Sequence, residues 1–169
     1  KKAKICIVGL GYVGLPLAIK FAKKGFNVYG FDKDISKINS LKKNLLYVDT
    51  IIKKDFYKEK NNKFLFGSST KNLKNYDIFI ICVPTPITKN KTPDMSFLHE
   101  SRDLFLNLNI KNKAIILEST TYPGTTEELF LPLIKSNNLK VGKDIALIYS
   151  PERIDPGNKK FNVDNTLKI

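Results

Sequence analysis

Short apolar runs alternate with longer amphipathic segments along the whole chain. The run Ile5–Val8 is rich in β-branched residues, and Asp77–Val83 is apolar at nearly every position, which is typical of parallel strands buried on both faces. Val13, Leu17 and Phe21 follow the first run at helical spacing. We expect strands at about 4–8, 27–31, 63–66, 77–83, 113–117 and 145–149, and helices at about 13–24, 35–43, 96–108 and 126–135, with a short helix within 45–60. This alternation predicts an α/β fold, a doubly wound parallel sheet with helices on both faces.

Three glycines join the first strand to the first helix. Gly9, Gly11 and Gly14 have the GxGxxG spacing of a phosphate-binding turn. The first glycine allows the tight turn, the second lets the backbone approach a pyrophosphate, and the third lets the helix pack closely on the sheet. The helix N-terminus would then direct its free N–H groups at the phosphates. The turn therefore makes the expected fold Rossmann-like.

An acid ends the second predicted strand. Asp32 lies eighteen residues after Gly14, where a carboxylate can accept hydrogen bonds from both hydroxyls of an adenosine ribose and repel a 2′-phosphate. A glycine-rich turn that binds nothing is the alternative. The strand, the helix and the acid together favour a dinucleotide site, and the acid favours NAD over NADP.

Composition narrows the class of protein. The 169 residues suffice for one full core and at most two small domains. The net charge of +13 would suit nucleic acid, but only two of the 29 basic residues, Arg102 and Arg153, are arginines, and the lysines are spread along the chain. We therefore expect no nucleic-acid partner. No apolar run has the length of a membrane helix and no signal peptide is visible, so we expect no membrane association and a cytoplasmic location.

The two cysteines and the single histidine suggest no further chemistry. Cys6 and Cys82 lie in apolar runs without ligand-spaced partners, so we interpret them as buried small hydrophobes and expect no metal site. His99 lies in a predicted helix and receives no catalytic role. Thr125 and Glu128 have the spacing of a capping box at the start of the last helix.

Polar or proline-rich loops follow four of the predicted strands. In an open parallel sheet, ligands bind beyond the carboxyl ends of the strands, near the reversal of strand order. We therefore expect the loops beginning at Val83, Glu118 and Ser150 to converge with the glycine turn on one cleft.

Five motifs, in this order, carry a family resemblance over essentially the whole chain. They are GLGYVGLPLA, FDKD, ICVPTP, ESTTYPGTTEE and YSPERIDPGN. Together they resemble the amino-terminal NAD-binding domain of the UDP-glucose/GDP-mannose dehydrogenase family. The sequences of the last two motifs are most similar to those of members that oxidise UDP-N-acetylhexosamines, above all UDP-N-acetylglucosamine, in surface-polysaccharide pathways.

The resemblance implies oxidation of the sugar C6 alcohol to the carboxylate with two NAD. The family's cysteine nucleophile lies in a later motif that this chain lacks, and neither Cys6 nor Cys82 matches it. Residues 1–169 are therefore expected to be the NAD-binding domain, without the central and UDP-binding domains and without turnover alone. The full-length enzyme is expected to be a homo-oligomer.

The resemblance also implies roles for single residues in cofactor binding. The amides of Tyr12 and Val13 would contact the pyrophosphate, Asp32 would hold the ribose, and Thr85 and Thr120 would line the nicotinamide side. Lys37 stands where the family has a cofactor-contacting lysine, although an exposed helix face is the alternative for this residue.

Further roles concern catalysis and the substrate. Glu152 matches the glutamate that acts with the threonine, here Thr120, on the hydrolytic water, since a carboxylate can position and deprotonate water. Arg153 and Ile154 match positions that touch the nucleotide sugar. A surface carboxylate is the alternative for Glu152, and a helix cap is the alternative for Thr120. The segment Asn44–Thr50 fits the family pattern loosely.

Two other functions stay open on the sequence. The first is another sugar specificity, for UDP-N-acetylmannosamine or UDP-glucose. The second is a dinucleotide-binding module without catalysis.

Overall fold

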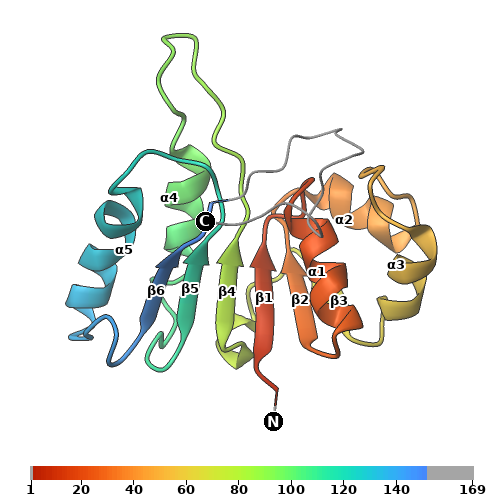
Figure 1. Cartoon of the computed structure of the whole chain (residues 1–169), viewed down its shortest axis with the longest axis horizontal. Coiled ribbons are helices and arrows are strands. Elements are labelled where there is room, and N and C mark those ends of the chain that lie inside the picture. Colours follow the sequence, from red (N-terminus) through yellow and green to blue (C-terminus); the bar gives the residue numbers. More distant parts are fainter. Residues whose placement is uncertain (1, 152–169) are drawn as a thin grey trace.

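A parallel sheet of six strands forms the centre of the molecule (Figure 1). The computed structural model describes residues 2–151, so the predictions for Glu152, Arg153 and Ile154 lie outside the described residues. The strands are β1 (Lys4–Val8), β2 (Asn27–Phe31), β3 (Phe64–Gly67), β4 (Ile78–Ile81), β5 (Ala114–Leu117) and β6 (Ala146–Tyr149). Their spatial order is β3-β2-β1-β4-β5-β6, and every neighbouring pair is parallel. This order is that of the Rossmann fold, which confirms the predicted fold class.

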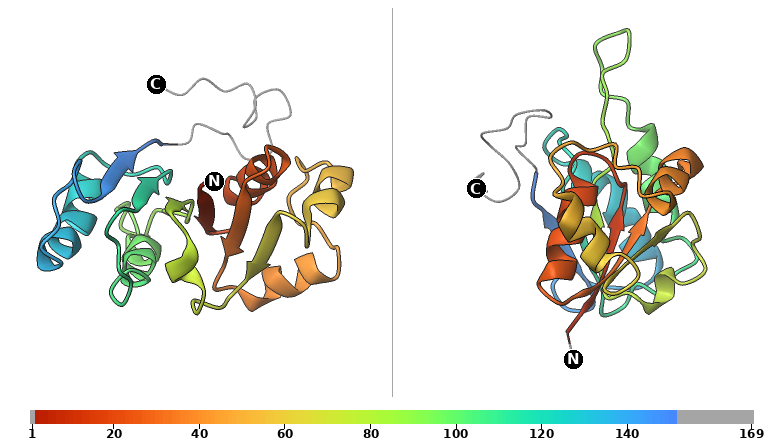
Figure 2. Two further views of the ribbon diagram at one scale, coloured as in Figure 1. Left: turned by 90° about the horizontal axis from the view of Figure 1, so that it is seen from below. Right: turned by 90° about the vertical axis from the view of Figure 1, so that its right-hand side faces the viewer.

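Helices cover both faces of this sheet. They are α1 (Gly14–Lys23), α2 (Ile35–Lys42), α3 (Lys53–Glu59), α4 (Ser96–Asp103) and α5 (Thr125–Ser136), with one 3₁₀ turn at Leu73–Asn75. Figure 2 shows α1 and α3 on one side of the sheet and α4 and α5 on the other. The side chains of β1 alternate accordingly. Ile5 and Ile7 pack into the core on the α1 side, and Cys6 and Val8 pack into the core on the α4 and α5 side.

Most predicted elements are present with small changes at their ends. The strand expected over 77–83 is confined to Ile78–Ile81, and the helix expected over 96–108 ends at Asp103. The apolar residues beyond Asp103 still reach the core, because Phe105 is fully buried without belonging to the helix. Both cysteines are buried, as expected, and neither forms a disulfide. Burial raises the pKa of the Cys6 thiol.

The predicted capping box at the start of α5 is wrong. Gly124 is the N-cap residue in a left-handed conformation, and no side chain caps the helix. The Thr125 hydroxyl instead donates to the carbonyl of Tyr122 at 2.8 Å, and Glu128 accepts from the Tyr122 hydroxyl at 2.7 Å. The two residues thus fasten the preceding loop to the helix. The hydrogen bond to Glu128 is also the main cause that raises the pKa of Tyr122.

The connection from β4 to α4 rises from the domain as a narrow hairpin (Figures 1 and 2). Ile87 pairs with Pro93 in an isolated antiparallel bridge, and the hydroxyls of Thr88 and Thr92 lie 2.8 Å apart. This hairpin begins directly after β4, at the edge of the sheet where the loops meet.

Candidate functional site

A cavity of about 850 Å³ lies at the carboxyl ends of β1, β2, β4 and β5. The strand order reverses beside β1, since β2 and β3 lie on one side of it and β4, β5 and β6 on the other. The cavity thus occupies the position where open parallel sheets bind their ligands. Its lining residues are Val8, Gly9, Gly11, Tyr12, Val13, Phe31, Asp32, Lys33, Asp34, Lys37, Cys82, Val83, Pro84, Thr85, Phe97, Glu100, Ser101, Leu104, Glu118, Ser119 and Thr120.

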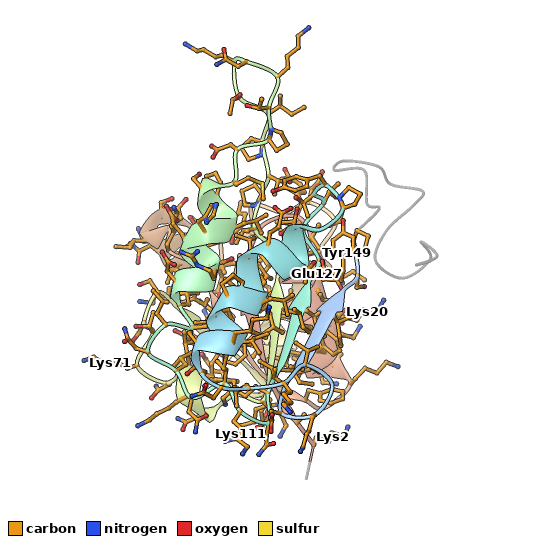
Figure 3. The ribbon with its side chains drawn as sticks, turned by 90° about the vertical axis from the view of Figure 1, so that its left-hand side faces the viewer. Lys2, Lys20, Lys71, Lys111, Glu127 and Tyr149 are labelled. Carbon is orange, nitrogen blue, oxygen red and sulfur yellow. The ribbon has the colours of Figure 1, made fainter. Side chains whose placement is uncertain are left out.

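The cavity brings together every described residue that the sequence proposed for cofactor binding except Gly14. It also confirms that the loops after β4 and β5 converge with the glycine turn. Figure 3 shows Tyr149 and Glu127 near the loops at the carboxyl ends of the strands, whereas Lys71 and Lys111 lie near the opposite ends of the strands. Lys71 and Lys111 are therefore not part of a basic patch around the cavity.

The three glycines of the turn meet three different steric situations. A Cβ on Gly14 would lie 1.8 Å from the carbonyl oxygen of Gly9, so a side chain there cannot coexist with the turn. Gly9 has φ +93° and would place its Cβ 2.8 Å from the carbonyl oxygen of Cys82. A Cβ on Gly11 would meet no atom within 4 Å. Gly9 and Gly14 are therefore required by the protein itself, whereas Gly11 leaves open space beside the cavity for a ligand.

The backbone of the turn offers unused donors at the start of α1. The Gly9 N–H donates to the carbonyl of Phe31 at 2.8 Å, and the Leu10 N–H donates to Asp32 at the same distance. Among residues 2–151, the N–H groups of Gly11, Tyr12 and Val13 have no protein acceptor. Such donors at a helix N-terminus bind phosphate groups. The turn thus fits the pyrophosphate of a dinucleotide.

Asp32 is buried at the end of β2, with 6% of its surface exposed. Its Oδ2 accepts the Leu10 N–H at 2.8 Å, and its Oδ1 accepts the Asp34 N–H at 2.9 Å. The Lys37 ammonium lies 3.4 Å from Oδ2. The carboxylate therefore orders the glycine turn, and its two oxygens have about four acceptor positions, so capacity remains for a sugar hydroxyl. Lys37 faces the cavity through this ion pair.

Asp34, two residues further on, is the N-cap of α2. Its side chain accepts from the backbone N–H groups of Ser36 and Lys37. The hydroxyl of Ser36 adds a 2.6 Å hydrogen bond, and this contact is the largest cause that holds the pKa of Asp34 below its usual value.

Hydroxyl groups tie the loop after β4 to the loop after β5. Thr85 Oγ1 donates to the carbonyl of Thr120 at 2.5 Å, and Ser119 Oγ donates to the carbonyl of Val83 at 2.7 Å. Thr120 does not cap α5, because the helix begins five residues later with Gly124 as its N-cap. Tyr149 at the end of β6 donates to the carbonyl of Thr121 at 3.3 Å. The two threonines proposed for the nicotinamide side are therefore neighbours.

Sequence reasoning missed several residues of the site. Lys33 interacts with Glu100 and lies 4.7 Å from the ring centroid of Phe97, so the end of β2 contacts α4 across the cavity. Glu118 is 6% exposed and also lines the cavity. Tyr47, outside the cavity lining, donates its hydroxyl to the carbonyl of Leu10 at 2.8 Å. The family motifs FDKD and ESTTYPGTTEE contain Lys33 and Glu118, but nothing in the helical pattern of α4 pointed to a ligand.

Within residues 2–151, no three or more His, Cys, Asp or Glu side chains are grouped so that they could hold a metal ion. None of the helices described there has both the length and the apolar character needed to cross a bilayer.

Comparisons with known proteins agree with this geometry. Residues 3–169 match the NAD binding domain of the UDP-glucose/GDP-mannose dehydrogenase family. CapL of Staphylococcus aureus is 39% identical over 98% of this chain and 38% of its own length. A UDP-N-acetyl-D-glucosamine 6-dehydrogenase of Pseudomonas aeruginosa is 37% identical over 100% of this chain and 40% of its own length.

The fold agrees with a solved relative as well. The UDP-D-ManNAc dehydrogenase of Pyrococcus horikoshii superposes with a TM-score of 0.81 and 32% identity, over 91% of this chain and 37% of that structure. The chain thus spans about two fifths of the length of the relatives it matches. It belongs to the UDP-glucose/GDP-mannose dehydrogenase family, of which it forms the NAD binding domain.

Proposed function

We propose that this chain is the cofactor-binding part of a UDP-N-acetylhexosamine 6-dehydrogenase, with UDP-N-acetylglucosamine as its substrate. The full-length enzyme would oxidise C6 to the uronic acid with two NAD, for surface-polysaccharide synthesis. It would be a cytoplasmic homo-oligomer, with its cysteine nucleophile and its central and UDP-binding domains in sequence beyond Ile169. The similarity to the Pseudomonas aeruginosa enzyme supports this substrate.

One observation carries the cofactor assignment. The cavity at the strand-order reversal combines the open space at Gly11, the unused N–H donors of Tyr12 and Val13, and the buried carboxylate of Asp32. These groups match a pyrophosphate next to a ribose that carries two free hydroxyls. Bound NAD would supply the hydride acceptor for the oxidation.

The chain's own residues have two tasks in this proposal. Tyr12, Val13, Asp32 and Lys37 would bind the phosphates and the ribose. Thr85 and Thr120, tied to each other, would line the nicotinamide side and exclude water from it. By the family resemblance, Glu152 would orient the hydrolytic water together with Thr120, while Arg153 and Ile154 would contact the nucleotide sugar.

Asp32→Ala tests the cofactor site. Loss of the ribose hydrogen bonds should weaken NAD binding by about 1–3 kcal/mol, measured by calorimetry, and should reduce the preference for NAD over NADP. The matched control is Asp55→Ala, which also removes a carboxylate paired with a lysine, here Lys23 at 2.6 Å, away from the cavity lining. Equal NAD affinity of Asp32→Ala and wild type would refute the assignment.

UDP-N-acetylmannosamine is a second candidate substrate, because relatives that act on it are nearly as similar to this chain. Relatives named UDP-N-acetyl-D-mannosamine dehydrogenase, such as that of Pyrococcus horikoshii, are 35% identical over 91% of this chain, close to the values for the glucosamine enzymes. Assay of the full-length enzyme with UDP-N-acetylglucosamine, UDP-N-acetylmannosamine and UDP-glucose distinguishes the three. NADH formation only from one of the last two would replace the proposed substrate.

A further inference from the structure

Tyr47 lies in the segment between α2 and α3, which the sequence matched to the family only loosely. Its hydroxyl donates a 2.8 Å hydrogen bond to the carbonyl oxygen of Leu10, in the middle of the glycine turn. The two residues are 37 positions apart, so this contact depends on the tertiary fold. The side chain is half-buried and does not line the cavity itself.

The segment that carries Tyr47 is well anchored. Val48 is 1% exposed in the core on the α1 side, and Leu46 and Ile51 pack against the same core. The Lys60 ammonium donates to Asn44 Oδ1 at 2.8 Å and so fixes the start of the segment. Tyr47 is therefore presented to the turn by packing on both sides of it.

The Tyr47 hydroxyl keeps its proton at physiological pH. Burial raises the pKa of Tyr47, and the nearby carboxylates of Asp32 and Asp34 raise it further. Because a backbone carbonyl can only accept, the hydroxyl acts here as a donor.

Leu10 is thus held at both of its peptide groups. Asp32 Oδ2 accepts its N–H at 2.8 Å, and Tyr47 holds its carbonyl oxygen at the same distance. The Leu10 carbonyl and the Gly11 N–H belong to one planar trans peptide, in which they point in opposite directions. Holding the carbonyl toward Tyr47 therefore fixes the Gly11 N–H on the side away from Tyr47.

We propose that Tyr47 is a positioning residue for the dinucleotide, which sets the orientation of the Leu10–Gly11 peptide so that the Gly11 N–H is available to the pyrophosphate. This inference rests on the proposed function, namely that the cavity binds NAD. Tyr47 acts through the turn and does not touch the ligand.

Tyr47→Phe removes only the hydroxyl and is the test. Without the bond, the peptide can rotate, and the dissociation constant for NAD should rise about three- to ten-fold, as expected for one net hydrogen bond. The matched control is Tyr29→Phe. The Tyr29 hydroxyl also donates to a backbone carbonyl, that of Ser69 at 2.9 Å, but Tyr29 is absent from the cavity lining. Both variants should lose similar stability in urea unfolding, whereas only Tyr47→Phe should lose NAD affinity.

Each outcome bears on the inference separately from the proposed function. If the wild-type chain binds no NAD in calorimetry, the proposed function fails. If wild type binds NAD and Tyr47→Phe binds it equally well, or Tyr29→Phe loses as much affinity, only the positioning role fails. A Tyr47→Phe chain that does not fold at 25 °C also overturns it, because the hydroxyl would then support the whole fold instead of one peptide.

Discussion

The two walls of the cavity are built by different means. On the β1–α1 wall, backbone atoms pack so closely that Gly14 has no space for a Cβ, and the glycine turn is held by backbone and carboxylate contacts. On the wall formed after β4 and β5, side-chain hydroxyls hold the loops together, as between Thr85 and Thr120. The first wall is fixed mainly by sterics, with a single side-chain hydroxyl, that of Tyr47, holding the carbonyl of Leu10. The second wall depends on several hydroxyl groups that single substitutions can remove. The two walls should therefore respond to mutation on different scales.

The largest effect is expected for Gly14→Ala. Its Cβ would lie 1.8 Å from the Gly9 carbonyl oxygen, so either the turn or α1 must move. We expect a loss of about 3 kcal/mol in the free energy of unfolding, the upper range for an overpacked site. Urea unfolding followed by circular dichroism measures it. A midpoint equal to that of wild type would show that this wall is not sterically fixed.

Gly11→Ala is the matched comparison within the same turn. Its Cβ meets no protein atom, so the free energy of unfolding should change by less than about 1 kcal/mol. The methyl group would occupy the space proposed for the pyrophosphate. We therefore expect NAD affinity, measured by calorimetry, to fall at least about ten-fold. Wild-type affinity in Gly11→Ala would place the phosphates elsewhere.

The smallest effect is expected on the hydroxyl-linked wall. Thr85→Val keeps the shape of the side chain but removes the donor to Thr120, which should reduce the free energy of unfolding by about 1 kcal/mol. Thr70→Val, at an exposed threonine whose hydroxyl has no hydrogen-bond partner among the described residues, is the control. Equal unfolding midpoints for the two variants would mean that the contact between the β4 and β5 loops contributes no stability.

The sequence predicted the β1–α1 wall well because sterics there dictate residue type. The GxGxxG motif itself implies a tight turn at Gly9 and close helix packing at Gly14, and both are found. Asp32 follows at the end of the next strand. The parallel sheet and the convergence of the loops after β4 and β5 with the glycine turn also followed from the alternation of elements.

The rest depends on tertiary distances that no local pattern encodes. The contact of Tyr47 with Leu10 joins residues far apart in sequence, and it arises because Val48 is buried nearby. The capping-box prediction was wrong because Glu128 accepts a hydrogen bond from the Tyr122 hydroxyl instead of from a backbone N–H. The spacing of Thr125 and Glu128 in the sequence does not distinguish these two partners. The sequence did not predict that α4 lines the cavity, because the position of Phe97 in the helical pattern is also that of a core residue.

Contacts within the chain already order the side chain of Asp32. Its carboxylate already accepts from two backbone N–H groups and pairs with Lys37 without any ligand. The conformational entropy of this side chain is therefore lost largely during folding and not at each encounter with a nucleotide. In the proposed NAD site, this carboxylate would therefore receive the ribose as a rigid acceptor, without induced fit at that side chain.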